Sequence, residues 1–240
     1  MKRISAIIAS GLALFVISCN NEAAKEEAKA VTDTAASVAS EPVATKPAFT
    51  PFKVVLIQHK VKNFAKAEAG YFKNDSLRQA AGITTYGLGR LLKDSNTVFV
   101  MDKIEDVEKT KAYFSAAKVK AAMSKSGVSS PPGFTYGEVV RENAGASATA
   151  DRVAITHHVK DYEAWLKSFD ASGDSARTSN GLIERAIIRN LDDPNTVSVF
   201  FEVSDMEKAK ARLASAEVKK KMKDGGVDSP PTIRWYREVK

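Results

Sequence analysis

An internal repeat restricts the fold of this 240-residue chain more than any other feature of its sequence. The apolar run 55–62 recurs as 153–160, and the Gly-Val-Ser-Ser-Pro-Pro run 127–132 recurs as the Gly-Val-Asp-Ser-Pro-Pro run 226–231. Each half of the repeat is long enough to form a small domain with a core of its own. The chain therefore contains two copies of one module.

The copies are 98 residues apart at the first of these runs and 99 residues apart at the second. The one-residue difference falls between Lys66 and Gly82. We place the first module at 53–140 and the second at 152–240. The segment 141–151 between them is rich in Ala, Ser and Gly, as expected of a linker.

The hydrophobic pattern of each copy predicts the order strand, helix, strand, strand, helix, strand. Alternating apolar residues indicate the strands, and apolar residues three and four positions apart indicate the first helix. In the second copy the predicted strands are 153–159, 182–188, 197–203 and 233–239. The first helix carries Tyr162, Trp165, Leu166 and Phe169. The second helix starts at the capping-box pair Ser204 and Glu207 and ends at Gly226. This order predicts an α+β fold of ferredoxin-like modules, each with both helices on one face of an antiparallel sheet.

The opposite face of each predicted sheet also needs a cover. Residues 83–88 and 98–101, in the second and third strands of the first module, carry apolar side chains on both faces. The sheet of the other module is the simplest cover for the second face. We therefore expect the two modules to pair their sheets within one chain, as an internal pseudo-dimer.

Three segments of the second module resemble the dimeric α/β-barrel superfamily, particularly its small members related to antibiotic-biosynthesis monooxygenases. These are the run 159–165, the Asp-Pro-Asn turn at 193–195 and the ending at 226–231. The resemblance extends over most of the first module, where a small residue near Ala67 replaces Trp165. It implies two tandem ferredoxin-like βαββαβ modules that form an intramolecular dimeric α/β barrel. The superfamily includes oxygenases, haem enzymes, isomerases and members without an assigned activity, so it implies a fold more than a function.

The N-terminus is typical of an export signal. Two basic residues precede an uncharged apolar run at 4–17, which is too short to span a bilayer comfortably as a mature helix. The run ends in Val-Ile-Ser-Cys, which resembles the lipobox of bacterial lipoproteins. The resemblance implies a signal peptide at 1–18, cleavage before Cys19 and acylation of Cys19 with fatty acids such as palmitate. An ordinary secretory signal with an incidental cysteine is the alternative.

A second segment, 19–51, has the composition of a flexible tether. It is rich in Ala, Glu, Lys and Thr, and Phe49 is its only aromatic residue, so it cannot bury enough apolar area to offset the entropy of ordering. Cys19 is the only cysteine of the chain, which excludes an internal disulfide. We expect a lipid-anchored protein of the cell envelope that faces the periplasm from the inner or the outer membrane.

Two histidines are candidates for a ligand site. His59 and His157 occupy equivalent positions on the first strands and share a face with the apolar residues of those strands. Because a ferredoxin-like sheet pairs its first and fourth strands, we expect Tyr136 beside His59 and Trp235 beside His157. Such pairs can bind a ligand or cofactor at the inner sheet face, with histidine as a proton carrier or an axial ligand. A hydrogen-bonded histidine packed against an aromatic core residue is the alternative.

Two arginines are the next candidates. Arg90 and Arg189 are equivalent residues late in the second strand of each module. A guanidinium at this place can bind an anionic substrate. It can equally form a salt bridge with a neighbouring carboxylate, Asp94 in the first module or Asp193 in the second.

Two other residues are expected to have structural roles. Trp165 lies on the apolar stripe of its helix and is expected in the core, and His158 points away from His157, toward solvent or a helix. Three histidines without a shared motif favour no metal site, and no motif indicates a cofactor. The lysines of the second helix of module 2 form a solvated helix face by default. As a functional alternative, they and the formal charge of +7 favour anionic lipid headgroups over nucleic acid, because no aromatic residues are interleaved with them.

Two functions remain open. The first is a small-ligand-binding or interaction protein of the envelope, with an apolar or anionic ligand. The second is an enzyme similar to the cofactor-independent monooxygenases or the haem-degrading relatives, acting in the barrel interior. The Asn, Trp and His set of the haem-degrading relatives has no residue-by-residue match here, which favours the first. A cavity with a few converging polar groups is the feature that an enzyme needs.

Overall fold

The computed structural model describes residues 49–239 of the chain. The predicted signal peptide, Cys19 and nearly all of the predicted tether lie outside the described residues. Between residues 49 and 239, no helix combines the length and the apolar character needed to cross a membrane.

The predicted order of elements is present in both modules. Module 1 contains β1 (Phe52–Lys60), α1 (Phe64–Lys73), α2 (Asp75–Gln79), β2 (Ile83–Leu91), β3 (Thr97–Ile104), α3 (Val107–Ser115), α4 (Ala117–Lys125) and β4 (Gly133–Glu142). Module 2 contains β5 (Asp151–His158), α5 (Tyr162–Ala171), α6 (Asp174–Thr178), β6 (Leu182–Asn190), β7 (Thr196–Val203), α7 (Met206–Ala214), α8 (Ala216–Asp224) and β8 (Thr232–Glu238). The expected second helix of each module is thus divided into two, a short helix (α2 or α6) follows the expected first helix, and residues 143–150 connect the modules.

The last helical segment of module 2 differs in detail from the prediction. Its N-cap is Asp205, whose carboxylate accepts a hydrogen bond from the Lys208 backbone N–H at 3.0 Å, so the predicted cap at Ser204 is wrong. The helix then breaks at Ser215, which has extended backbone angles and caps α8 through its hydroxyl. The Asp205 carboxylate and the Ser215 hydroxyl each satisfy a free backbone N–H at a helix start. The equivalent break in module 1 falls at Ala116, which has extended angles without a side-chain cap, so the Ser215 hydroxyl supports the break but is not required for it.

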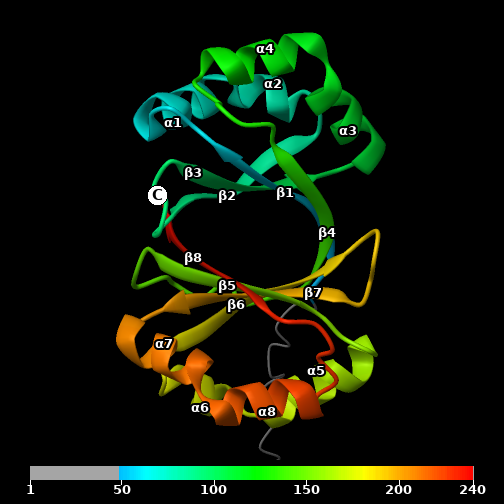
Figure 1. Ribbon diagram of the computed structural model, residues 1–240. Coiled ribbons are helices and arrows are strands. Elements are labelled where there is room, and N and C mark those ends of the chain that lie inside the picture. Colours follow the sequence, from blue (N-terminus) through cyan, green and yellow to red (C-terminus); the bar gives the residue numbers. More distant parts are fainter. Residues whose placement is uncertain (1–48, 240) are drawn as a thin grey trace, which may run out of the picture. The chain divides into compact units, whose positions relative to one another are not determined.

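The strands form one closed antiparallel barrel in the order β1-β3-β2-β8-β5-β7-β6-β4. The sheets of the two modules join where β2 pairs with β8 and where β4 pairs with β6. Figure 1 shows α1–α4 outside one half of the barrel and α5–α8 outside the other half. The predicted fold is confirmed: two ferredoxin-like modules pair their sheets within one chain.

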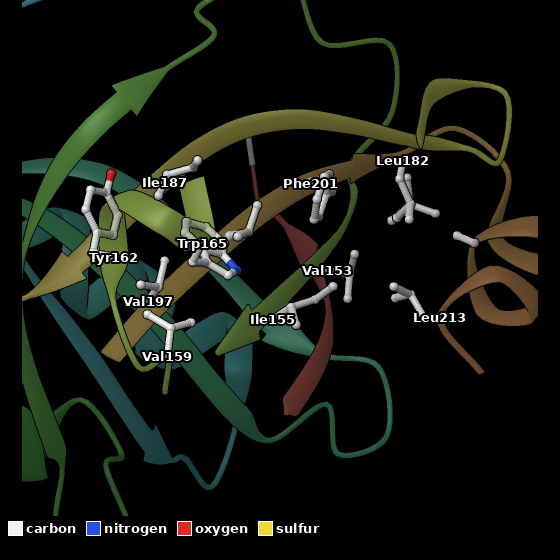
Figure 2. Close-up of a cluster of buried hydrophobic side chains, with 13 residues drawn as sticks. Val153, Ile155, Val159, Tyr162, Trp165, Leu182, Ile187, Val197, Phe201 and Leu213 are labelled. Carbon is white, nitrogen blue, oxygen red and sulfur yellow. The ribbon is translucent and has the colours of Figure 1, made fainter. Parts of the chain in front are cut away.

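The alternation of side chains along each strand creates three apolar layers. On β1, Val55 and Ile57 pack under the helices of module 1, whereas Val54 packs inside the barrel. The corresponding layer of module 2 contains Trp165, whose indole Figure 2 shows among the aliphatic side chains of the sheet. Burial on both faces explains why the strands are apolar on both sides.

The one-residue difference between the copies lies between the two short helices. Ser172 and Gly173 separate α5 from α6, whereas Asn74 alone separates α1 from α2. Gly173 has a φ of +79°, a left-handed conformation that glycine adopts without steric penalty. The extra residue therefore changes how α6 follows α5 in module 2.

Candidate functional site

Both candidate histidines face the helices rather than the barrel interior. His157 follows Val153 and Ile155 on the face of β5 that packs under α5–α8, and His59 holds the same place on β1. The expected location at the inner sheet face is therefore wrong. The histidines lie in the layer between sheet and helices, where each borders a pocket.

The predicted pairs of histidine and aromatic residue do not form across the strands. Tyr136 is opposite Val55 and Trp235 is opposite Val153, each four residues before the histidine along its strand. Four residues of strand correspond to about 13 Å. The aromatic neighbour of His157 is instead Trp165 on α5, with ring centroids 5.6 Å apart.

The pocket of module 2 lies between α5–α8 and the strands β5–β7 and has a volume of about 390 Å³. Trp165 and Phe169 form a wall of two stacked rings, with centroids 5.2 Å apart. Trp165 is 4% exposed, so its predicted place in the core is confirmed, although it also lines this pocket. The remaining apolar lining comes from Ile155, Leu182, Val199, Phe201, Leu213, Val218 and Met222.

His157 is the buried polar group of this pocket. Its side chain is 5% exposed, and neither ring nitrogen has a hydrogen-bond partner among the described residues. Burial lowers the pKa of His157 from 6.5 to about 4, so the imidazole is neutral at pH 7. A neutral imidazole offers one donor and one acceptor, and leaving both unpaired costs about 1–3 kcal/mol for each group.

The rim of the pocket carries charges that are already paired. Arg212 lies 2.8 Å and Lys221 2.9 Å from the two carboxylate oxygens of Glu217. Arg177 stacks over the Phe169 ring, 4.1 Å from its centroid, and donates a hydrogen bond to the Phe169 carbonyl oxygen at 2.8 Å. The pocket is therefore apolar inside, and the cations at its edge have ion-pair partners.

The equivalent pocket of module 1 has a volume of only about 90 Å³. Asp102 stands where module 2 has Phe201, since these residues are opposite Val55 and Val153 in the same register. The Tyr71 hydroxyl donates a hydrogen bond to Asp102 and lies 2.9 Å from the Thr85 hydroxyl. Burial raises the pKa of Asp102 to about 6. Polar side chains that bond to one another thus occupy this space.

The two candidate arginines stack on aromatic rings. The Arg189 guanidinium lies 3.9 Å from the Tyr162 ring centroid, and the Arg90 guanidinium lies 4.9 Å from that of Phe64. The expected salt bridges with Asp94 and Asp193 do not form. Asp94 instead pairs with Lys60 at 3.3 Å, and Asp193 accepts a hydrogen bond from the Thr196 hydroxyl at 2.6 Å. Attraction of a cation to a ring face explains the placement of both arginines.

His158 is a surface residue with its own partner. Its Nδ1 lies 2.6 Å from a carboxylate oxygen of Asp228, a contact that raises the pKa of His158. It lies on the opposite face of β5 from His157, as predicted. Within residues 49–239, no group of three or more His, Cys, Asp or Glu side chains is arranged to hold a metal ion.

The barrel interior is packed in its middle, and a pocket lies on each side of the packed rings, one of about 570 Å³ and one of about 340 Å³. Phe99 lies between Phe200 and Tyr236, with centroid distances of 6.1 and 5.2 Å. On one side of these rings a cavity of about 570 Å³ opens, and Arg234 of β8 is among its lining residues. Arg234 is absent from the sequence-based candidates, although its alternation with Trp235 on the last strand would have indicated the opposite face.

Solved structures with the same fold support this architecture. A protein provisionally assigned as a monooxygenase from Lactobacillus acidophilus NCFM is 14% identical, with a TM-score of 0.50 over 78% of this chain and 94% of that chain. An anthrone oxidase-like protein is 13% identical, with a TM-score of 0.53 over 79% of this chain and 92% of that chain. A second protein provisionally assigned as a monooxygenase, from Fusobacterium nucleatum, is 10% identical, with a TM-score of 0.51 over 79% and 93% of the two chains.

At these identities the likeness establishes the fold alone. No protein-family model matches the chain, and no curated protein matches it by sequence.

Proposed function

We propose that module 2 binds a small, flat, largely apolar molecule in the pocket between its helices and its sheet. The observation that carries this proposal is His157, a buried neutral imidazole without a hydrogen-bond partner that borders a pocket of about 390 Å³. Pockets for small molecules combine this size with an apolar lining and a few polar groups. A ligand with one oxygen would give His157 the partner that the described residues do not.

The lining favours an aromatic ligand of no net charge. Trp165 and Phe169 offer ring surfaces, whereas the cations at the rim pair with Glu217 or with other carboxylates. Because His157 can donate or accept a hydrogen bond, both a phenol and a quinone match its chemistry. Entry of either next to the imidazole requires a small displacement of Trp165, since both ring nitrogens are covered.

The low pKa of His157 favours binding over catalysis. A general base is most effective when its pKa lies near the working pH, and a value of about 4 makes His157 a weak base at pH 7. An oxygenase acting on a ligand in the same pocket is the second candidate, because proteins of this fold include an anthrone oxidase-like protein.

Haem does not fit this site. A histidine that ligates iron normally donates its other ring N–H to a carboxylate or a backbone carbonyl. Neither nitrogen of His157 has such a partner in the part of the chain that the structure describes.

The proposal includes the cellular location. The Val-Ile-Ser-Cys run that ends at Cys19 supports lipid anchoring in the cell envelope. Metabolic labelling with an alkyne-bearing palmitate analogue tests this in the full chain. We expect label on the wild-type protein and none on Cys19→Ala; equal labelling of both would contradict the anchor.

The binding proposal is tested with the full chain and two probes, 2-naphthol and 2-methyl-1,4-naphthoquinone, by isothermal titration. The variant His157→Phe keeps a ring of similar size but removes both hydrogen-bonding atoms. His59→Phe is the matched control in module 1. We expect His157→Phe to weaken binding about fivefold to tenfold, the effect of one hydrogen bond, and His59→Phe to leave it within twofold. Equal effects of the two variants, or no binding to the wild type, would refute the proposal.

A further inference from the structure

The cavity at one end of the barrel is separate from the pocket of module 2. It has a volume of about 570 Å³ and shares no lining residue with that pocket. Its walls come from the inward-facing side chains of both modules, because the strands of both close the barrel. A ligand here would contact the face of the sheets that His157 does not reach.

The cavity contains a cation without a counterion. Arg234 is opposite Ala154 in the register of β5 and β8, so it lies on the interior face. Within residues 49–239, no carboxylate lies within salt-bridge distance of Arg234, and the cavity lining includes no acidic residue. Partial burial lowers the pKa of Arg234, but the guanidinium keeps its charge at neutral pH.

The two modules differ at this position. Thr135 is opposite Leu56 where Arg234 is opposite Ala154, so the cavity has a hydroxyl on one side and a guanidinium on the other. Exposed Arg237 on the same strand is by contrast paired with Asp151 at 2.8 Å. An unpaired arginine in a concave, partly buried place attracts anions more strongly than one on a convex surface.

Polar and apolar lining residues together indicate the kind of anion. The hydroxyls of Thr156 and Ser198 lie 2.8 Å apart, and the side-chain oxygen of Asn190 is engaged by two backbone N–H groups, which leaves its amide N–H₂ to donate. The deeper wall is formed by Phe99 and Phe200. The arrangement suits a molecule with one anionic group and an apolar body.

We propose that this cavity binds a small organic carboxylate, with its carboxylate group on Arg234 and its apolar body against Phe99 and Phe200. A guanidinium matches a carboxylate by two parallel hydrogen bonds, which gives orientation as well as affinity. One hydroxyl of the hydrogen-bonded pair Thr156 and Ser198, and the amide of Asn190, supply further donors.

The test uses the full chain and two probes of equal shape, 2-naphthoate and the uncharged 2-naphthamide, by isothermal titration at low ionic strength. The variants are Arg234→Gln, which removes the charge, and Arg234→Lys, which keeps it. Arg237→Gln is the matched control on the same strand, and circular dichroism checks that each variant is folded.

We expect 2-naphthoate to bind the wild type at least tenfold more tightly than 2-naphthamide. Arg234→Gln should remove that preference, Arg234→Lys should keep part of it, and Arg237→Gln should leave it within twofold. Equal binding of the acid and the amide to the wild type, unchanged binding to Arg234→Gln, or no binding of 2-naphthoate up to millimolar concentration would each overturn the proposal. If Arg234→Gln does not fold, Arg234→Lys and the acid–amide comparison in the wild type decide.

Discussion

The two modules share a backbone fold and a buried histidine but differ in what lies between helices and sheet. In module 1, Asp102, Tyr71 and Thr85 bond to one another and leave about 90 Å³. In module 2, Phe201 and Phe169 stand in place of Asp102 and Tyr71, and about 390 Å³ is open beside His157. A hydrophobic layer closed by a few bonded polar side chains and a layer with an open apolar pocket are thus both compatible with one fold. Within a single chain, one copy can preserve packing while the other carries a pocket.

The largest expected effect on the free energy of unfolding comes from placing a module 1 side chain in the layer between the helices and the sheet of module 2. Phe201→Asp places a carboxyl where module 2 offers no hydroxyl equivalent to that of Tyr71, and it also removes a buried phenyl ring. We expect the free energy of unfolding to fall by about 3–5 kcal/mol, from lost packing and carboxylate desolvation. Urea denaturation at pH 7 measures the change. A loss below about 1 kcal/mol would mean that the module 2 layer tolerates charge as module 1 does.

The next largest expected effect is a difference between the two modules in how their buried groups make stability depend on pH. Burial raises the pKa of Asp102 from 3.8 to about 6, so the folded state binds more protons than the unfolded state between these pH values. The stability contributed by this group is therefore present below pH 4 and is lost as the pH rises to 6, by about 3 kcal/mol at most. The pKa of His157 is lowered, so its titration increases stability as the pH rises from 4 to 6.5.

The relevant measurement for Asp102 is consequently a difference between proteins. Urea denaturation of the wild type and Asp102→Asn from pH 4 to pH 7 isolates the contribution of Asp102 to the pH dependence of stability, because the histidines titrate equally in both proteins. Relative to the variant, the wild type should lose stability as the pH rises. A constant difference across this range would show that Asp102 has an ordinary pKa.

Removing the unpaired imidazole of His157 should increase stability, by less than Phe201→Asp decreases it. His157→Phe replaces two buried polar atoms without partners by apolar ones, so we expect a gain of about 1–2 kcal/mol in the free energy of unfolding at pH 7. The same denaturation experiment measures it. A loss of stability would indicate that His157 packs better than phenylalanine and would weaken its assignment as a ligand contact.

The repeat and the hydrophobic alternation are sufficient to predict the fold. Apolar residues on both faces of β2 and β3 require two covers, and the two copies supply them as helices and as each other's sheets. Helix breaks at Ala116 and Ser215 are not visible in the pattern, because each depends on one residue with extended backbone angles inside an otherwise helical run.

The site could be predicted only in part. Alternation places His157 on the face of Ile155, but which face is inside the barrel depends on how the two sheets meet. The register of β5 and β8 places Trp235 opposite Val153, and no local signal in either strand specifies that offset. The same uncertainty applies to Arg234, because alternation places it on the face opposite Trp235 without specifying which face is inside the barrel. Cavity volume follows from side-chain packing of several elements, which a sequence pattern does not contain.

The most direct test of the open pocket in module 2 uses the fluorescence of Trp165. The chain has two tryptophans, so Trp235→Phe leaves Trp165 as the only one. We expect 2-methyl-1,4-naphthoquinone to quench Trp165 in a saturable manner in this variant, and His157→Phe in the same background to shift the midpoint to about fivefold to tenfold higher concentration. Quenching that rises linearly without saturation, or that is unchanged by His157→Phe, would contradict binding beside His157.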